Sequence, residues 1–167
     1  MTQSGSDAAD TPIAGVAHVG FTVSDVEAEA AFYGALLGCT PEVRAVYDRP
    51  YTAAQVGYEG ARLDIAIFRL PGSDVRLELI QYLHPVGRPV DIETKNPGTG
   101  HLCLLTDDIE DAMARAIARG ATARSDGPVT ITAGPNAGRR VCYLRDPEGI
   151  TIELLEPRRR EPPAGLA

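Results

Sequence analysis

The sequence of 167 residues contains no tryptophan, and aromatic residues make up only 5% of it. Stacking platforms for single-stranded nucleic acids are therefore scarce, and a formal net charge of −7 argues against any nucleic-acid partner. No apolar run approaches the roughly 18 residues of a membrane span. Residues 1–12 have neither the basic start nor the apolar stretch of a signal peptide. We therefore expect a cytoplasmic protein with no nucleic-acid or membrane partner.

Cysteine is also scarce. Cys39, Cys103 and Cys142 are an odd number, and their spacings match no metal-binding motif. This pattern favours reduced thiols over a disulfide framework. The length itself permits one domain or two very small ones, so the organisation of the chain has to come from the order of its segments.

The chain contains a repeated unit. Two segments of the first half recur in the second half in the same order, with a modest difference in the length between them. The pairs are VAHVGFTVSDVE at residues 16–27 with TGHLCLLTDDIE at 99–110, and RLELI at 76–80 with TIELL at 151–155. This alignment places His18 on His101 and Glu78 on Glu153. Two matches in one order indicate a duplicated module with loops of different length.

Each half has the same order of expected elements. An alternating strand is followed by a helix that Asp25 or Asp108 can cap, and then by strands that end in a hairpin. The order β-α-β-β-β, twice, predicts an α+β fold. The expected later strands are 42–47, 62–70 and 75–82 in the first half, and 121–124, 140–145 and 150–156 in the second. The expected organisation is a disordered leader (1–12), a first module (13–83), a linker rich in Pro and Gly (84–98), a second module (99–157) and a flexible tail (158–167).

Four ligand-type residues occupy equivalent strand positions. Glu78 and Glu153 each stand between two apolar residues. Strand side chains alternate between faces, so each carboxylate points away from the face that its neighbours bury. His18 and His101 stand in the expected first strand of each half. If the two sheets close on each other, two imidazoles and two carboxylates converge. That donor set suits a divalent transition metal such as Co, Ni, Zn, Mn or Fe.

Four segments together resemble a known family: HVGFTVSD, RLELIQ, GHLCLLTDDIEDAMARAIARGA and RRVCYLRDPEGITIELLEP. Over residues 13–157 the chain resembles the vicinal oxygen chelate superfamily, the glyoxalase I-like metalloenzymes. The resemblance implies two paired βαβββ modules in a cupped, partly closed mixed sheet, around a metal ion held by His18, Glu78, His101 and Glu153. In this superfamily the modules pair within one chain or across two chains, and we expect a homodimer.

The ligand set implies a reaction class. Glyoxalase I and methylmalonyl-CoA epimerase use a complete set of this kind, with Gln or Glu at the second position in the epimerase. The resemblance therefore implies a metal-dependent isomerase, epimerase or lyase that stabilises an enolate or enediolate next to a carbonyl. The expected substrate is a CoA thioester or a 2-oxo or 2-hydroxy acid.

Three alternatives stay open. A glyoxalase I-type lactoylglutathione lyase is less favoured, because Thr22 and Tyr82 stand where the bacterial enzyme has the Arg and Asn that hold glutathione. An Fe(II)-dependent dioxygenase uses two His and one Glu, so Glu78 as a fourth ligand fits it less well. A small-molecule binding or resistance protein on the same fold usually loses metal ligands, and here all four are filled.

Catalytic and substrate-binding residues are also predicted. Glu153 is a candidate base, and Asp64 is a second one, because some epimerases carry an acidic base in this strand. Asp64 shares a face with Glu78 only if the turn before Val75 has three residues, since a one-residue slip turns every side chain over. For substrate binding, the candidates are Arg139 and Arg140, which follow a loop of small residues, and Tyr143.

Overall fold

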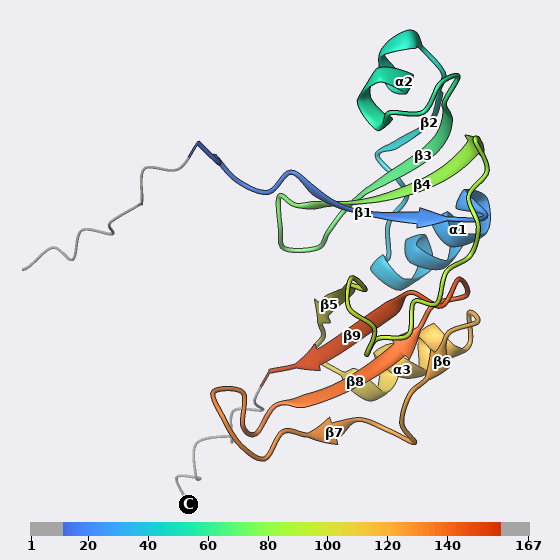
Figure 1. Cartoon of the computed structure of the whole chain (residues 1–167). Coiled ribbons are helices and arrows are strands. Elements are labelled where there is room, and N and C mark those ends of the chain that lie inside the picture. The colour runs from blue at the N-terminus through green and yellow to red at the C-terminus, as the bar shows by residue number, and fades with distance from the viewer. Residues whose placement is uncertain (1–11, 158–167) are drawn as a thin grey trace, which may run out of the picture.

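The computed structural model describes residues 12–157 (Figure 1). The expected tail and all of the expected leader except Pro12 lie outside the described residues. The first half contains β1 (His18–Val23), α1 (Val26–Leu37), β2 (Val43–Tyr47), α2 (Pro50–Val56), β3 (Arg62–Arg69) and β4 (Arg76–His84). The second half contains β5 (His101–Leu105), α3 (Ile109–Ile117), β6 (Thr122–Ala123), β7 (Val129–Thr130), β8 (Arg140–Arg145) and β9 (Thr151–Glu156). Among these residues, no helix is long and apolar enough to cross a membrane.

The strands form two mixed sheets, and the predicted α+β class is confirmed. Their orders are β1-β4-β3-β2 and β5-β9-β8-β6, with β7 also paired to β8. In each sheet the first strand of the module lies parallel to its last strand, and the other pairs are antiparallel. The same topology twice is the structural form of the sequence repeat. The sheets lie one above the other in Figure 1 and do not close into a barrel.

Two local features were not expected from the sequence. The first is α2, which has Pro50 in its first turn and ends at Gly57 in the left-handed conformation, the usual start and stop signals of a helix. The second is β7, an additional short strand beyond the expected strand 121–124, of which only the two residues of β6 are paired. Asp126, Gly127 and Pro128 lie between these strands and interrupt the pairing with β8.

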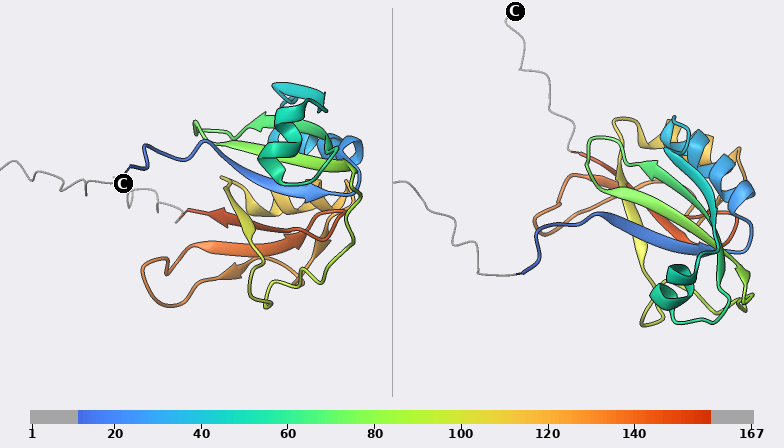
Figure 2. Two further views of the ribbon diagram at one scale, coloured as in Figure 1. Left: turned by 45° about the horizontal axis from the view of Figure 1, so that its top comes forward. Right: turned by 90° about the horizontal axis from the view of Figure 1, so that it is seen from above.

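One hydrophobic core spans both modules. It contains residues from α1 and α3, together with the sheet faces that these helices cover. The largest fully buried apolar side chains are Tyr33, Phe68, Leu77, Leu79, Ile109, Leu144, Ile152 and Leu154. Burial of each large aliphatic side chain contributes about 1.5–3 kcal/mol. The two helices therefore pack together where the modules meet, and the other face of each sheet carries no helix from this pair (Figure 2).

Polar contacts add to the junction between the modules. The Tyr33 hydroxyl donates a hydrogen bond of 2.9 Å to Asp146, in the turn between β8 and β9. In the same turn, Glu148 accepts hydrogen bonds from the backbone N–H and the hydroxyl of Ser24. Glu29 is only 1% exposed beside this group. Burial, and then the charge of Asp146, raise the pKa of Glu29 to about 8, so its carboxyl is largely protonated at neutral pH.

Glu29→Gln is expected to stabilise the protein increasingly as the pH rises. The pKa of Glu29 rises on folding from 4.5 to about 8, so the folded chain binds a proton that the unfolded chain releases between these values. The free energy of unfolding therefore falls with pH across this window. Thermal melting should show a gain in Tm of several degrees at pH 8 and a smaller gain at pH 5. The control is Glu27→Gln on the same helix, and an equal gain at both pH values would contradict the assignment.

Candidate active site

The first module brings His18 and Glu78 together. β1 and β4 are parallel, and their register places Gly20 opposite Glu78, with His18 two residues earlier on the same face. His18 Nε2 lies 3.4 Å from Glu78 Oε2. A Cβ at Gly20 would lie 3.5 Å from that oxygen, so glycine leaves the space above the carboxylate open. This pair is the first half-site, on the face of the sheet that α1 does not cover.

The second module repeats this arrangement. The parallel register of β5 and β9 places Cys103 opposite Glu153, and His101 Nε2 lies 3.0 Å from Glu153 Oε2. Tyr143 of β8 is opposite Glu153 on the other side, and its ring centroid is 5.4 Å from that of His101. This pair, His101 and Glu153, is the second half-site.

Two side chains beside the second half-site, those of Cys103 and Tyr143, are protonated at neutral pH. Burial, and then Glu153, raise the pKa of the Cys103 thiol to about 11. The same two causes raise the pKa of the Tyr143 phenol. Both groups therefore face the carboxylate as neutral side chains.

The half-sites are open and separate within one chain. The side chains of His18 and His101 are 52% and 38% exposed. Within residues 12–157, no three His, Cys, Asp or Glu side chains form a group that could hold one metal ion. The repeat thus places the four predicted ligands in two equivalent pairs, but the fold of a single chain does not bring the pairs together.

Asp64 is corrected from a candidate base to a structural residue. The Leu70 amide donates to the Val75 carbonyl at 3.2 Å, so the turn has four residues and Ile67 faces Glu78. Asp64 is opposite Gln81 and lies on the other face of the sheet. There its carboxylate forms a close ion pair with Arg44.

Arg140, a predicted substrate-binding residue, lies on the opposite face of the sheet from Tyr143 and Glu153. Its guanidinium contacts Glu110 and donates to Glu156, which is 2% exposed on the helix-covered face. Arg139 makes backbone hydrogen bonds with Asn136 and Ile131, and it lines neither of the cavities described below. Tyr143 is the predicted substrate-binding residue that lies beside a half-site.

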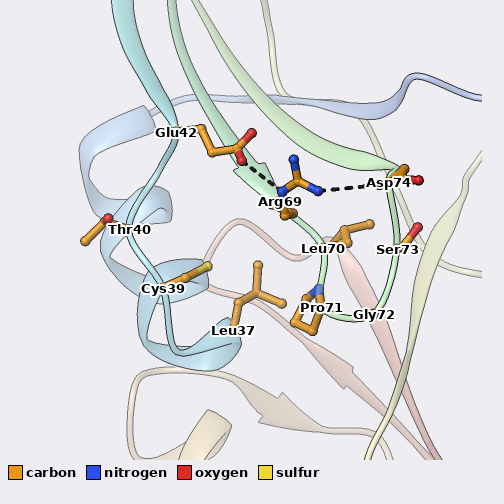
Figure 3. Close-up of a pocket in the computed structure, with 10 residues that line it drawn as sticks. All are labelled: Leu37, Cys39, Thr40, Glu42, Arg69, Leu70, Pro71, Gly72, Ser73 and Asp74. Atoms are coloured by element: carbon orange, nitrogen blue, oxygen red, sulfur yellow. Dashed lines mark hydrogen bonds and ion pairs between the residues drawn. The ribbon is translucent and has the colours of Figure 1, made fainter.

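A first cavity lies away from both half-sites. It measures about 650 Å³ and lies between the end of α1 and the β3–β4 turn (Figure 3). Glu42 there accepts hydrogen bonds of 3.0 Å from both Arg69 and Arg76. These two guanidiniums lower the pKa of Glu42. The carboxylate and guanidinium charges at this cavity thus neutralise one another. The cavity lining contains none of the four predicted metal ligands.

The second cavity borders the second half-site. It measures about 390 Å³, and its lining is Arg124, Ser125, Val129, Ile131, Val141, Cys142, Tyr143 and Glu153. Arg124 was not predicted as a site residue. Its backbone N–H donates to the Tyr143 carbonyl at 3.0 Å, which places Arg124 next to Tyr143 in the sheet. The sequence does not reveal this pairing, because the neighbouring strand β6 has only two residues. The cavity places a basic side chain near a predicted metal ligand.

Comparisons with known proteins identify the family of this chain. The model of the Glyoxalase/Bleomycin resistance protein/Dioxygenase superfamily matches residues 17–143, and the chain belongs to this superfamily. It is 29% identical over 143 residues to a 2-epi-5-epi-valiolone epimerase of Actinomyces sp, covering 84% of this chain and 78% of that protein. It is 33% identical over 144 residues to an ethylmalonyl-CoA/methylmalonyl-CoA epimerase of Cereibacter sphaeroides, covering 82% and 93%.

A solved structure supports the fold. The glyoxalase family protein from Bacillus cereus superposes with a TM-score of 0.79 at 23% identity, covering 90% of this chain and 99% of that one. At this identity the likeness extends to the fold alone. The predicted family is therefore confirmed by the comparison of sequences, and the predicted fold by the solved structure.

Proposed function

We propose that the protein is a metal-dependent epimerase or isomerase that moves a proton on a carbon next to a carbonyl group. The observation that carries the proposal is the pair of equivalent half-sites, His18 with Glu78 and His101 with Glu153. Two relatives in the same superfamily are epimerases. The substrate classes that fit this chemistry are a CoA thioester and a 2-oxo or 2-hydroxy acid.

The donor atoms of the half-sites fit a divalent metal ion. Imidazole nitrogens and carboxylate oxygens together suit Co, Ni, Zn, Mn or Fe, and two carboxylates balance the charge of the ion. When bound, the ion would supply a Lewis acid that stabilises negative charge on a substrate oxygen. In each module the carboxylate contacts the imidazole, so each module would supply one carboxylate and one imidazole to the ion.

In this proposal the centre forms between two copies of the chain. α1 and α3 occupy the junction inside one chain, whereas both half-sites lie on faces open to solvent. β1 pairs only with β4, and β5 only with β9, within the described residues. A symmetric homodimer can bring the first half-site of each copy to the second half-site of the other. Two complete sets of four ligands then form, one on each side of the symmetry axis.

Glu153 is the group that moves the proton in this proposal. Its side chain is 18% exposed, borders the second cavity and stands between Cys103 and Tyr143 in the sheet register. A positioned carboxylate can take a proton from a carbon and return it. Glu78 supplies an equivalent carboxylate from the other half-site. Two carboxylates on opposite sides of a planar carbon meet the stereochemical requirement of epimerisation.

Metal binding is the direct test of the donor set. The metal-free protein should bind Co²⁺ or Ni²⁺ at one ion per chain, with a rise in Tm, because the ion binds the folded state alone. His101→Ala should weaken binding at least about tenfold, whereas the control His84→Ala, outside both half-sites, should not. Calorimetry and thermal melting measure both effects. A wild-type protein with neither bound metal nor a gain in Tm would rule out the proposal.

Subunit complementation tests whether two chains share the centre. His18→Ala and His101→Ala each damage every centre of their own homodimers. Co-expressed chains form mixed dimers in which one centre keeps both His residues, so random pairing should restore about a quarter of the wild-type centres. Metal content of the mixed preparation, compared with each variant alone, gives the answer. No recovery in verified mixed dimers would place the whole centre within one chain.

Isotope exchange tests the reaction. The Co²⁺-loaded protein, incubated with methylmalonyl-CoA in D₂O, should introduce deuterium at the carbon between the two carbonyl groups, as NMR or mass spectrometry would show. Glu153→Gln should slow exchange about 10²–10⁴-fold because it removes the proton acceptor. The exposed Glu59→Gln serves as the control. Absence of exchange by the wild-type protein would remove this thioester as a substrate.

A further inference from the structure

A single row of side chains connects the second half-site to a basic residue. Cys103, Glu153 and Tyr143 are successive partners across β5, β9 and β8. The backbone of Arg124 extends the row, because its N–H donates to the Tyr143 carbonyl. Neighbouring strands lie about 4.8 Å apart, so the backbones of Glu153 and Arg124 are separated by about 10 Å. Glu153, Tyr143 and Arg124 all line the second cavity.

The cavity between these residues has a mixed lining. Its volume of about 390 Å³ lies within the usual range for small-molecule sites. Val129 and Val141 are paired across β7 and β8, and with Ile131 they form an apolar side. A molecule that reaches from Glu153 to Arg124 would therefore lie along a hydrocarbon surface between two polar ends.

The basic end of the cavity is held by a fixed arrangement of charges. Glu93 Oε1 lies 2.8 Å from a guanidinium nitrogen of Arg124 and 3.0 Å from one of Arg145. The Arg145 side chain is only 10% exposed and also donates to the carbonyl of Ile92 at 2.9 Å. One carboxylate thus holds two guanidiniums, which are always ionised at physiological pH. Asp91 also interacts with the charge of Arg145, and of these groups only Arg124 lines the cavity.

We propose that Arg124 binds an anionic group of the substrate, a carboxylate or a phosphate, at the end remote from the reacting carbon. This inference rests on the proposed function, which places the oxygens next to the reacting carbon at the half-sites. The substrate is then a molecule with two neighbouring oxygens, a short hydrocarbon segment against Val129 and Val141, and a terminal anion at Arg124. Arg124, rather than Arg140, is the residue that selects for that anion.

The test compares ligands that differ only at this end. 2-Oxovalerate, 2-oxoglutarate and 2-oxo-4-phosphonobutyrate share the 2-oxo acid group and end in a methyl, a carboxylate and a phosphonate. Calorimetry with the Co²⁺-loaded full chain should give at least about tenfold tighter binding for one of the two anionic ends, and the tighter one distinguishes carboxylate from phosphate. Arg124→Gln should abolish this preference and leave the Kd of 2-oxovalerate unchanged.

A matched variant and a metal-free measurement complete the test. Arg119→Gln removes the same charge from an exposed position outside the cavity lining and should keep the preference. In metal-free protein, glutarate and inorganic phosphate report on the basic end alone. One of them should raise the Tm of the wild type and of the Arg119 variant more than that of the Arg124 variant.

The outcomes separate this inference from the proposed function. Equal Kd values for all three oxo acids in the wild type, or a preference that survives Arg124→Gln, would overturn the role of Arg124. If the protein binds no Co²⁺, the proposed function is ruled out. The change in Tm of the metal-free protein with glutarate or phosphate then tests the anion site independently. An equal Tm response in the three proteins would overturn the site by itself.

Discussion

Burial of one face of each sheet against α1 and α3 is the constraint on which the rest of the structure depends. The shared core holds Leu77 and Leu79 of β4 and Ile152 and Leu154 of β9. Because strand side chains alternate, Glu78 and Glu153 must then point to the opposite faces. The parallel neighbours β1 and β5 carry His18 and His101 on these same faces. The apolar residues of β4 and β9 thus stabilise the core, and their alternation places each carboxylate on the same face as its histidine.

The same burial explains why a single chain holds two half-sites. α1 and α3 meet in the junction, and the hydrogen bond from Tyr33 to Asp146 joins one module to the last turn of the other. These contacts stabilise the chain without drawing the ligand-bearing faces together. In the proposed function, assembly of two chains is therefore part of the chemistry, because the contacts that fold one chain leave each donor set half complete.

Local patterns allowed the repeat, the main helices and both His–Glu pairs to be predicted, because each depends on alternation or capping within a few residues. Asp25 and Asp108 cap α1 and α3 as expected. Local patterns did not determine features that depend on turn length or on distant partners. Asp64 lies on the wrong face because the turn before Val75 has four residues, and Arg140 is held by Glu110 and Glu156 from two other elements. Arg124 was missed because its register emerges only in the folded sheet.

Divergence between the two modules separates two tasks within the proposed centre. Both modules have a carboxylate beside an imidazole, but the residue opposite the carboxylate on the antiparallel neighbouring strand differs. Ile67 faces Glu78 in the first module, whereas Tyr143 faces Glu153 in the second. The cavity that ends at Arg124 lies beside Tyr143, in the second module alone. A shared centre would combine one half-site from the first module with one half-site from the second module. The first module would then contribute ligands, and the second would contribute ligands together with the surface that recognises the substrate. Such asymmetry in each centre, repeated by the symmetry of the dimer, gives a bound substrate one orientation rather than two.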